Sequence, residues 1–160
     1  MSMYRQLWFA IIVSMLVALA GSLLASSLSA RSYLSEQLAM KNTDNAAALA
    51  LSLSLREPDA VEVELAVSAL FDSGHYELIR VTDPRGKVIV ERKIDPGVKG
   101  VPAWFVRLLP LVSPPGEAQV TSGWKQFGTV HLVSHSRFAY ESLWKNVWEL
   151  AGALFVATLI

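Results

Sequence analysis

A run of uncharged residues near the N-terminus constrains this chain more than any other feature. Leu7 to Leu28 contains no charged side chain and consists mainly of Leu, Ala, Ile, Val and Ser. As a helix rising about 1.5 Å per residue, these 22 residues extend roughly 33 Å, enough to cross a bilayer core of about 30 Å. Arg5 and the terminal amine precede the run, which favours a cytoplasmic N-terminus. The sequence therefore predicts a transmembrane helix over residues 7–28, with residues 1–6 in the cytoplasm.

A cleaved signal peptide is the alternative to this helix. Ala18-Leu19-Ala20 resembles a cleavage site, with small residues at two positions. The apolar run, however, is longer than the roughly 7–15 residues of a signal-peptide core and continues beyond that site. The length of the run therefore favours an uncleaved membrane helix.

The C-terminal end of the chain is also uncharged. Its last 11 residues follow Glu149, and Trp144 and Trp148 come just before them, where an interfacial aromatic belt is expected. Eleven residues are fewer than the roughly 20 needed to cross a bilayer. Residues 149–160 are therefore predicted to start a second transmembrane helix that the end of the sequence truncates, and residues 29–148 to form one periplasmic domain.

Composition and motifs exclude several functions for this domain. The chain has 14 basic and 14 acidic residues, so it has no net charge to attract nucleic acid. Because it has no cysteine, it can form no disulfide, thiolate metal site or cysteine nucleophile. His131 and His135 would stand roughly 13 Å apart on a strand, too far to share a metal. No hydrolase, phosphate-binding or zinc-protease motif occurs, so no catalysis, cofactor or metal is expected in this chain.

The remaining pattern predicts an α+β domain. The expected elements are a helix continuing from the membrane to about residue 55, a helix at 60–72, strands at 76–82 and 87–93, a short helix at 101–109, strands at 117–122 and 129–134, and a last helix from residue 136. Asp83-Pro84-Arg85-Gly86 has the residues of a type I turn and would close the first hairpin. By analogy of element order alone, this is a PAS-like antiparallel sheet with long flanking helices.

Two pairs of aromatic residues have different predicted roles. The connection of the second hairpin, residues 123–128, holds Trp124 and Phe127 between two glycines. Large aromatic side chains at an exposed tip are typical of binding hot spots, but such a ring can also fold back onto the sheet as core. The residues alone leave both alternatives open. Trp104 and Phe105 lie among apolar residues on the short helix and are predicted to be core.

Five segments of the chain together resemble the N-terminal periplasmic region of the LapD family of membrane receptors for cyclic di-GMP. They are FDSGHY (71–76), IRV (79–81), VPAWFVRL (101–108), GWKQ (123–126) and VSH (133–135). No single segment is diagnostic, but all five occur in order, and the resemblance extends from the first membrane helix to the second.

The resemblance implies a homodimeric receptor of the bacterial inner membrane, with a PAS-like periplasmic domain whose elements are exchanged between protomers. Its cytoplasmic part would contain a HAMP segment and degenerate GGDEF and EAL domains, and the EAL domain would bind cyclic di-GMP. That binding switches the periplasmic domain to capture LapG, a calcium-dependent periplasmic cysteine protease. The captured protease cannot cleave a large surface adhesin, so the biofilm persists.

In this family a tryptophan of the second periplasmic hairpin inserts into the protease, and Trp124 matches it here. The resemblance therefore implies a partner-binding site of Gly123, Trp124, Lys125, Gln126 and Phe127. Lys125 departs from the family pattern, in which an acidic residue often follows the tryptophan, and this would change the charge presented to the protease. The alternative function is a periplasmic small-ligand-sensing domain of a sensor kinase or of a diguanylate cyclase or phosphodiesterase. That function would need a polar-lined pocket in the concave face of the sheet.

Overall fold

The computed structural model describes residues 3–56, 59–95, 97–98 and 100–159, so the predicted segments 1–6 and 149–160 lie partly outside it. The first element, α1, is one helix from Met3 to Ser54. It contains a single glycine and no proline, so nothing interrupts it between the apolar run and the domain. Among the described residues, α1 is the one helix long and apolar enough to cross a membrane, judged by length and composition.

Four strands form one antiparallel sheet in the order β2-β1-β4-β3. They are β1 (Tyr76–Thr82), β2 (Val88–Lys93), β3 (Gly116–Ser122) and β4 (Lys125–Ser134). In the predicted turn between β1 and β2, the Gly86 N–H donates to the Asp83 carbonyl over 2.9 Å. Both predicted hairpins and the α+β class are confirmed, although β4 begins at Lys125 and not near Thr129.

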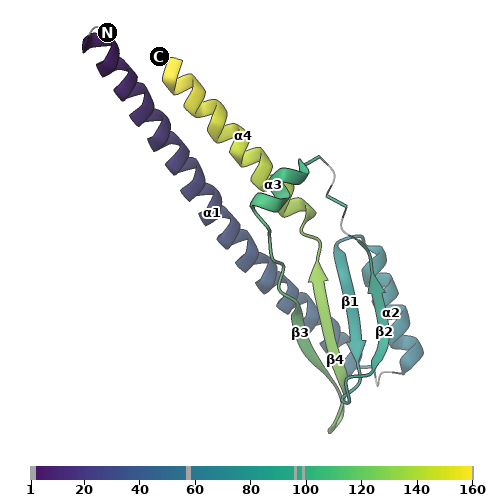
Figure 1. Cartoon of the computed structure of the whole chain (residues 1–160). Helices are drawn as coiled ribbons and strands as arrows, with labels where there is room; N and C mark the ends of the chain where they lie inside the picture. Colours follow the sequence, from purple (N-terminus) through teal and green to yellow (C-terminus); the bar gives the residue numbers. More distant parts are fainter. Residues whose placement is uncertain (1–2, 57–58, 96, 99, 160) are drawn as a thin grey trace.

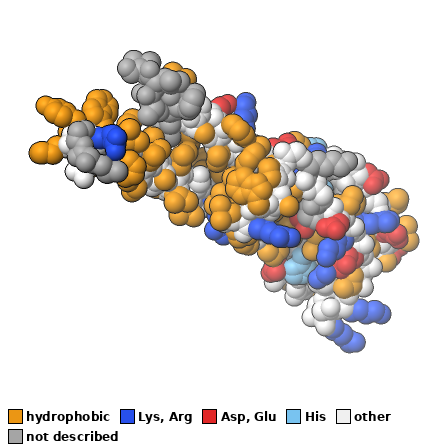
Figure 2. Space-filling view, turned by 45° about the horizontal axis from the view of Figure 1, so that its top comes forward, with side chains coloured by type: hydrophobic (Ala, Val, Ile, Leu, Met, Phe, Trp, Pro, Cys, Tyr) orange, Lys and Arg blue, Asp and Glu red, His pale blue; other side chains and the backbone are white. Residues whose placement is uncertain are grey.

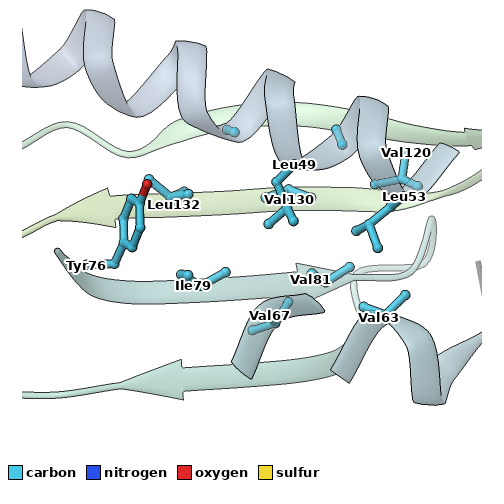
Figure 3. Packing of buried hydrophobic residues seen from close by; sticks show 12 residues of the cluster. Leu49, Leu53, Val63, Val67, Tyr76, Ile79, Val81, Val120, Val130 and Leu132 are labelled. Carbon is cyan, nitrogen blue, oxygen red and sulfur yellow. The ribbon is translucent and has the colours of Figure 1, made fainter. Parts of the chain in front are cut away.

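The main core lies between this sheet and two helices. α1 and α2 (Ala60–Asp72) cover the same face of the sheet, and their apolar side chains meet those of three strands (Figure 3). The core consists of Ala46, Leu49, Ala50, Leu53, Val63, Val67, Tyr76, Ile79, Val81, Val120, Val130 and Leu132. Fully burying each larger side chain contributes about 1.5–3 kcal/mol, so this cluster is the main source of the stability of the domain.

A buried polar residue fastens α1 to the sheet. The Asn42 side chain is fully buried; its amide donates to the Pro114 carbonyl (2.6 Å) and to Ser113 Oγ (3.1 Å). Its Oδ1 accepts from the Ser134 N–H over 2.9 Å. Gly116 lies so close to the backbone of Asn42 that a Cβ there would overlap it. The helix therefore contacts both the start of β3 and the end of β4 without an intervening side-chain layer.

A smaller apolar cluster joins two further helices to α1. These helices are α3 (Ala103–Leu108) and α4 (Arg137–Leu159). Phe105 and Leu143 are buried there, and Ala30 and Leu34 of α1 pack against them. The prediction that Trp104 is also core is wrong: its side chain is 60% exposed, because adjacent residues of a helix point in different directions and Phe105 takes the inward position.

The molecule has a helical end and a domain end. α1 and α4 lie side by side with both chain ends together, and the β3–β4 turn lies at the opposite end (Figure 1). Hydrophobic side chains gather over the helical end, whereas acidic and basic side chains gather over the domain end (Figure 2). α4 remains helical to Leu159, but its crossing of a membrane stays a prediction. If α1 crosses the membrane as predicted, the β3–β4 turn is the part farthest from it.

Candidate partner-binding hairpin

The connection between β3 and β4 is a turn of two residues, Gly123 and Trp124. Ser122 and Lys125 pair across it, and Gly123 has a φ of +59°. Two-residue hairpin turns need a positive φ at their first position, which glycine adopts without steric cost. Gly123 occupies this first position, and Trp124 occupies the second, at the tip of the hairpin.

The Trp124 side chain is fully exposed. Its relative exposed surface is 105%, compared with 60% for Trp104 and 63% for Trp148. The ring therefore does not fold back onto the sheet. A tryptophan that becomes enclosed buries roughly 150–250 Å², and here the core receives none of that burial. Trp124 therefore contributes nothing to the packing of this domain.

The structure separates Phe127 from the exposed tip. Gln126 pairs with Thr121 and Gly128 pairs with Val120, so Phe127 is the extra residue of a β-bulge. Its side chain is partly buried and packs against the main core. The expectation of a longer exposed connection containing Phe127 is wrong, because strand pairing continues almost to the turn and the bulge directs this ring inward.

Three other predicted residues stay with Trp124 at the tip. Gly123, Lys125 and Gln126 are exposed and lie within two residues of Trp124 in the chain. Lys125 follows Trp124 directly and is exposed, so it adds one positive charge to the tip. A charge at the rim of a protein interface generally acts more on association rate than on affinity. The tip thus combines an apolar anchor with one cationic and one amide side chain.

The last turn of α1 supports the base of the hairpin. At the bulge, the Thr121 N–H donates to Ser54 Oγ over 3.0 Å, and Ser54 Oγ donates to the Ala50 carbonyl over 2.7 Å. Sequence reasoning did not identify Ser54, because a serine near a helix end gives no signal of a partner 67 residues away. The contact connects the helix that begins in the apolar run to the strand that leads to Trp124.

The open face of the sheet carries charged side chains in a row. Glu91, Arg80, His131 and Glu117 occupy paired positions across β2, β1, β4 and β3. The Arg80 guanidinium pairs with the Glu91 carboxylate, and His131 Nδ1 lies 3.1 Å from Glu117 Oε1. These groups are partly exposed, so such pairs contribute little to stability. Within the described part of the chain, no three His, Asp or Glu side chains are grouped to hold a metal ion.

Most of the chain, residues 23–144, matches a known family model, that of the LapD/MoxY periplasmic domain. A solved structure described as "Structure of Pseudomonas fluorescence LapD periplasmic domain" shares 44% sequence identity with the chain. That match covers 77% of this chain and 98% of the other, with a TM-score of 0.44. No curated protein sequence matches the chain significantly.

Proposed function

Because this chain belongs to the LapD/MoxY periplasmic domain family, we propose that it is the periplasmic output domain of an inner-membrane cyclic di-GMP receptor and captures a LapG-type calcium-dependent cysteine protease through Trp124. Capture would keep the protease from cleaving a surface adhesin and so promote biofilm. Cyclic di-GMP would bind at a cytoplasmic EAL domain of the receptor and not at this domain.

The exposed ring of Trp124 is the observation that carries this proposal. A tryptophan that is 105% exposed has an unfavourable apolar contact with water that a partner's pocket would remove. The two-residue turn fixes the backbone of Trp124 between paired strands, so little backbone freedom is lost when the ring binds. Truncating an aromatic anchor of this kind typically lowers the binding free energy by about 2 kcal/mol or more.

The continuity of α1 supports control of the hairpin from the membrane side. α1 is uninterrupted from Met3 to Ser54, and the Ser54 hydroxyl holds the hairpin base. In a homodimer, a movement of α1 would therefore reach the hairpin without passing through a hinge. Cyclic di-GMP would favour the arrangement of the protomers that presents both Trp124 rings. It can shift the population only by its differential affinity for the two arrangements.

The filled core favours partner binding over small-ligand sensing. A sensing domain of this topology would need a polar pocket under the helices that cover the sheet. That space is occupied by strand side chains with no exposed surface, namely Ile79, Val81, Val120, Val130 and Leu132. The cavities described are instead open grooves along α1, such as the one that Leu49 and Leu70 line between α1 and α2.

The test compares Trp124→Glu with Leu65→Glu in the full-length receptor reconstituted in vesicles. Leu65 is 65% exposed on α2, so each substitution places a carboxylate where an apolar side chain already faces water. With cyclic di-GMP and calcium present, Trp124→Glu should weaken protease capture at least roughly 30-fold, the equivalent of about 2 kcal/mol. Leu65→Glu should capture normally, and both variants should keep the wild-type Tm.

A conservative variant makes the outcome specific for the ring. Trp124→Phe keeps an aromatic anchor and should capture the protease more tightly than Trp124→Glu does. Undiminished capture by Trp124→Glu, with an unchanged Tm, would contradict the proposal. An equal loss in the Leu65→Glu variant would also contradict it, because the effect would then not be specific for the hairpin.

A further inference from the structure

The short helix α3 packs onto α1 just beyond the uncharged run. Phe105 belongs to the cluster in which Ala30 and Leu34 of α1 take part. These two α1 residues follow Leu28, the end of the run, by two and six positions, which is roughly 3–9 Å along the helix axis. The headgroup layer adds roughly 5–8 Å to each side of the hydrocarbon core. α3 therefore lies at the level of the headgroups of a bilayer that α1 crosses.

α4 independently places the membrane surface at the same level. A crevice between α1 and α4 is lined by Ser26 and Ser27 on one side and by Glu149 and Leu150 on the other. The uncharged segment of α4 thus begins beside the residues where the uncharged run of α1 ends. Two helices that run in opposite directions change from polar to apolar at one height, as they must if both meet the same membrane plane.

The side of α3 that turns away from the cluster is apolar and exposed. Trp104 is 60% exposed and Leu108 is 65% exposed, and Trp148 of α4 is 63% exposed. The rings of Trp104 and Trp148 each lie 5.9 Å from the ring of Trp144, edge to face, so the three indoles form one continuous row. Arg107 on the same helix is also exposed.

We propose that this face, formed by Trp104, Arg107, Leu108 and Trp148, docks onto the lipid headgroup layer beside α1. The inference rests on α1 crossing the bilayer and not on capture of a protease. The occupant is a lipid surface because α3 packs against α1 directly after the end of its uncharged run, and hydrophobic side chains gather over the helical end (Figure 2). Tryptophan prefers this layer, where its ring is in apolar surroundings and its N–H remains hydrated. The Arg107 side chain can extend its charged end toward lipid phosphates.

Docking of α3 would set the height and tilt of the domain above the membrane. The segment that follows α3 is tied to both long helices: the Leu111 N–H donates to the Tyr140 hydroxyl (2.7 Å), and the Ser35 hydroxyl donates to the Val112 carbonyl (2.7 Å). This segment leads directly into β3. A lipid contact at α3 would therefore be a third attachment to the membrane besides the two long helices.

Spin labels at single cysteines test this inference cleanly, because the native chain has none. Leu108→Cys is compared with Val17→Cys in the apolar run and Val61→Cys on α2, in vesicles of phosphatidylethanolamine and phosphatidylglycerol. The three positions are similarly exposed, at 65%, 67% and 62%. The label at 108 should collide several-fold less with a water-soluble nickel chelate than the label at 61, and more than the label at 17.

Three results would overturn the inference. The label at 108 could be as accessible to the chelate as the label at 61, which would show a face in water. It could be shielded but show dipolar broadening from a second label, which would show that another copy of the chain covers it. The label at 17 could be water-accessible, which would remove the membrane crossing itself. The first two results leave the capture assay on Trp124 unaffected, so there the two proposals fail separately. The third would remove the membrane anchor from the proposed receptor as well, whereas capture through Trp124 would still be read by its own assay.

Discussion

Replacing Asn42 by alanine tests whether one buried side chain fastens the long helix to the sheet. The Asn42 side-chain amide binds the Pro114 carbonyl, the Ser113 hydroxyl and the Ser134 N–H; the bond to Ser134 is buried and the other two are partly buried. Alanine fits the helix but provides none of these hydrogen bonds. Asn42→Ala therefore leaves backbone groups of two other segments without partners.

The expected cost is large relative to the stability of a domain of this size. A buried group left unsatisfied costs about 1–3 kcal/mol, and Asn42→Ala removes the partner of the buried Ser134 N–H and of the partly buried Pro114 carbonyl. The higher helix propensity of alanine offsets about 0.5 kcal/mol of this loss of stability. We expect a net loss of about 2–5 kcal/mol, against a total that is typically about 5–15 kcal/mol.

Amide hydrogen exchange at the end of β4 reads this loss directly, because protection there depends on the opening of the Ser134 hydrogen bond. Exchange in the membrane-inserted chain should accelerate at least roughly 30-fold, since every 1.4 kcal/mol corresponds to a factor of ten. Asn45→Ala is the matched control, because Asn45 lies one turn away, is half-buried and takes no part in this network. Equal exchange in the two variants would refute the reasoning that Asn42 fastens α1 to the sheet.

Three further predictions concern other parts of the structure. Gly116→Ala should lower the stability by more than about 2 kcal/mol in a thermal melt, because its Cβ overlaps the backbone of Asn42; Gly21→Ala, which faces open space, should leave the melt unchanged. Phe105→Ala should cost about 3–5 kcal/mol and increase hydrogen exchange in α3, since this ring is the buried contact between α3 and α1. Burial raises the pKa of the Tyr76 phenol above 10.0, so the folded state keeps this proton to a higher pH than the unfolded state. The contribution of the protonated Tyr76 phenol to the folding stability is therefore fully present below pH 10.0 and is lost as the pH rises through the folded-state pKa. Tyr76→Phe should remove that alkaline loss when urea midpoints below and above this pH are compared.

The features that the sequence predicted well are those that neighbouring residues determine. The turn at Asp83 was predictable because proline and glycine at fixed offsets specify it. The direction of Phe127 was not, because a bulge opposite Val120 sets it. The partners of Asn42 lie 71 to 92 residues away, so no local pattern contains them. The exposure of Trp124 depends on where strand pairing ends. Because the connection has a glycine at each end, Gly123 and Gly128, the sequence did not determine that point.

The Asn42 contact also limits which movements could transmit a signal from the membrane. Sliding α1 along the sheet by one turn, about 5.4 Å, would move Asn42 away from Ser134 and Pro114 and leave their hydrogen bonds with Asn42 unmade. Each unsatisfied group would cost about 1–3 kcal/mol, and the couplings between sites that signalling typically supplies are themselves only about 1–3 kcal/mol. Internal sliding is therefore disfavoured, and α1 moves together with the sheet and the hairpin at Ser54. In the receptor that we propose, cyclic di-GMP would change the arrangement of one protomer relative to the other, with each unit of α1, sheet and Trp124 hairpin moving as one body.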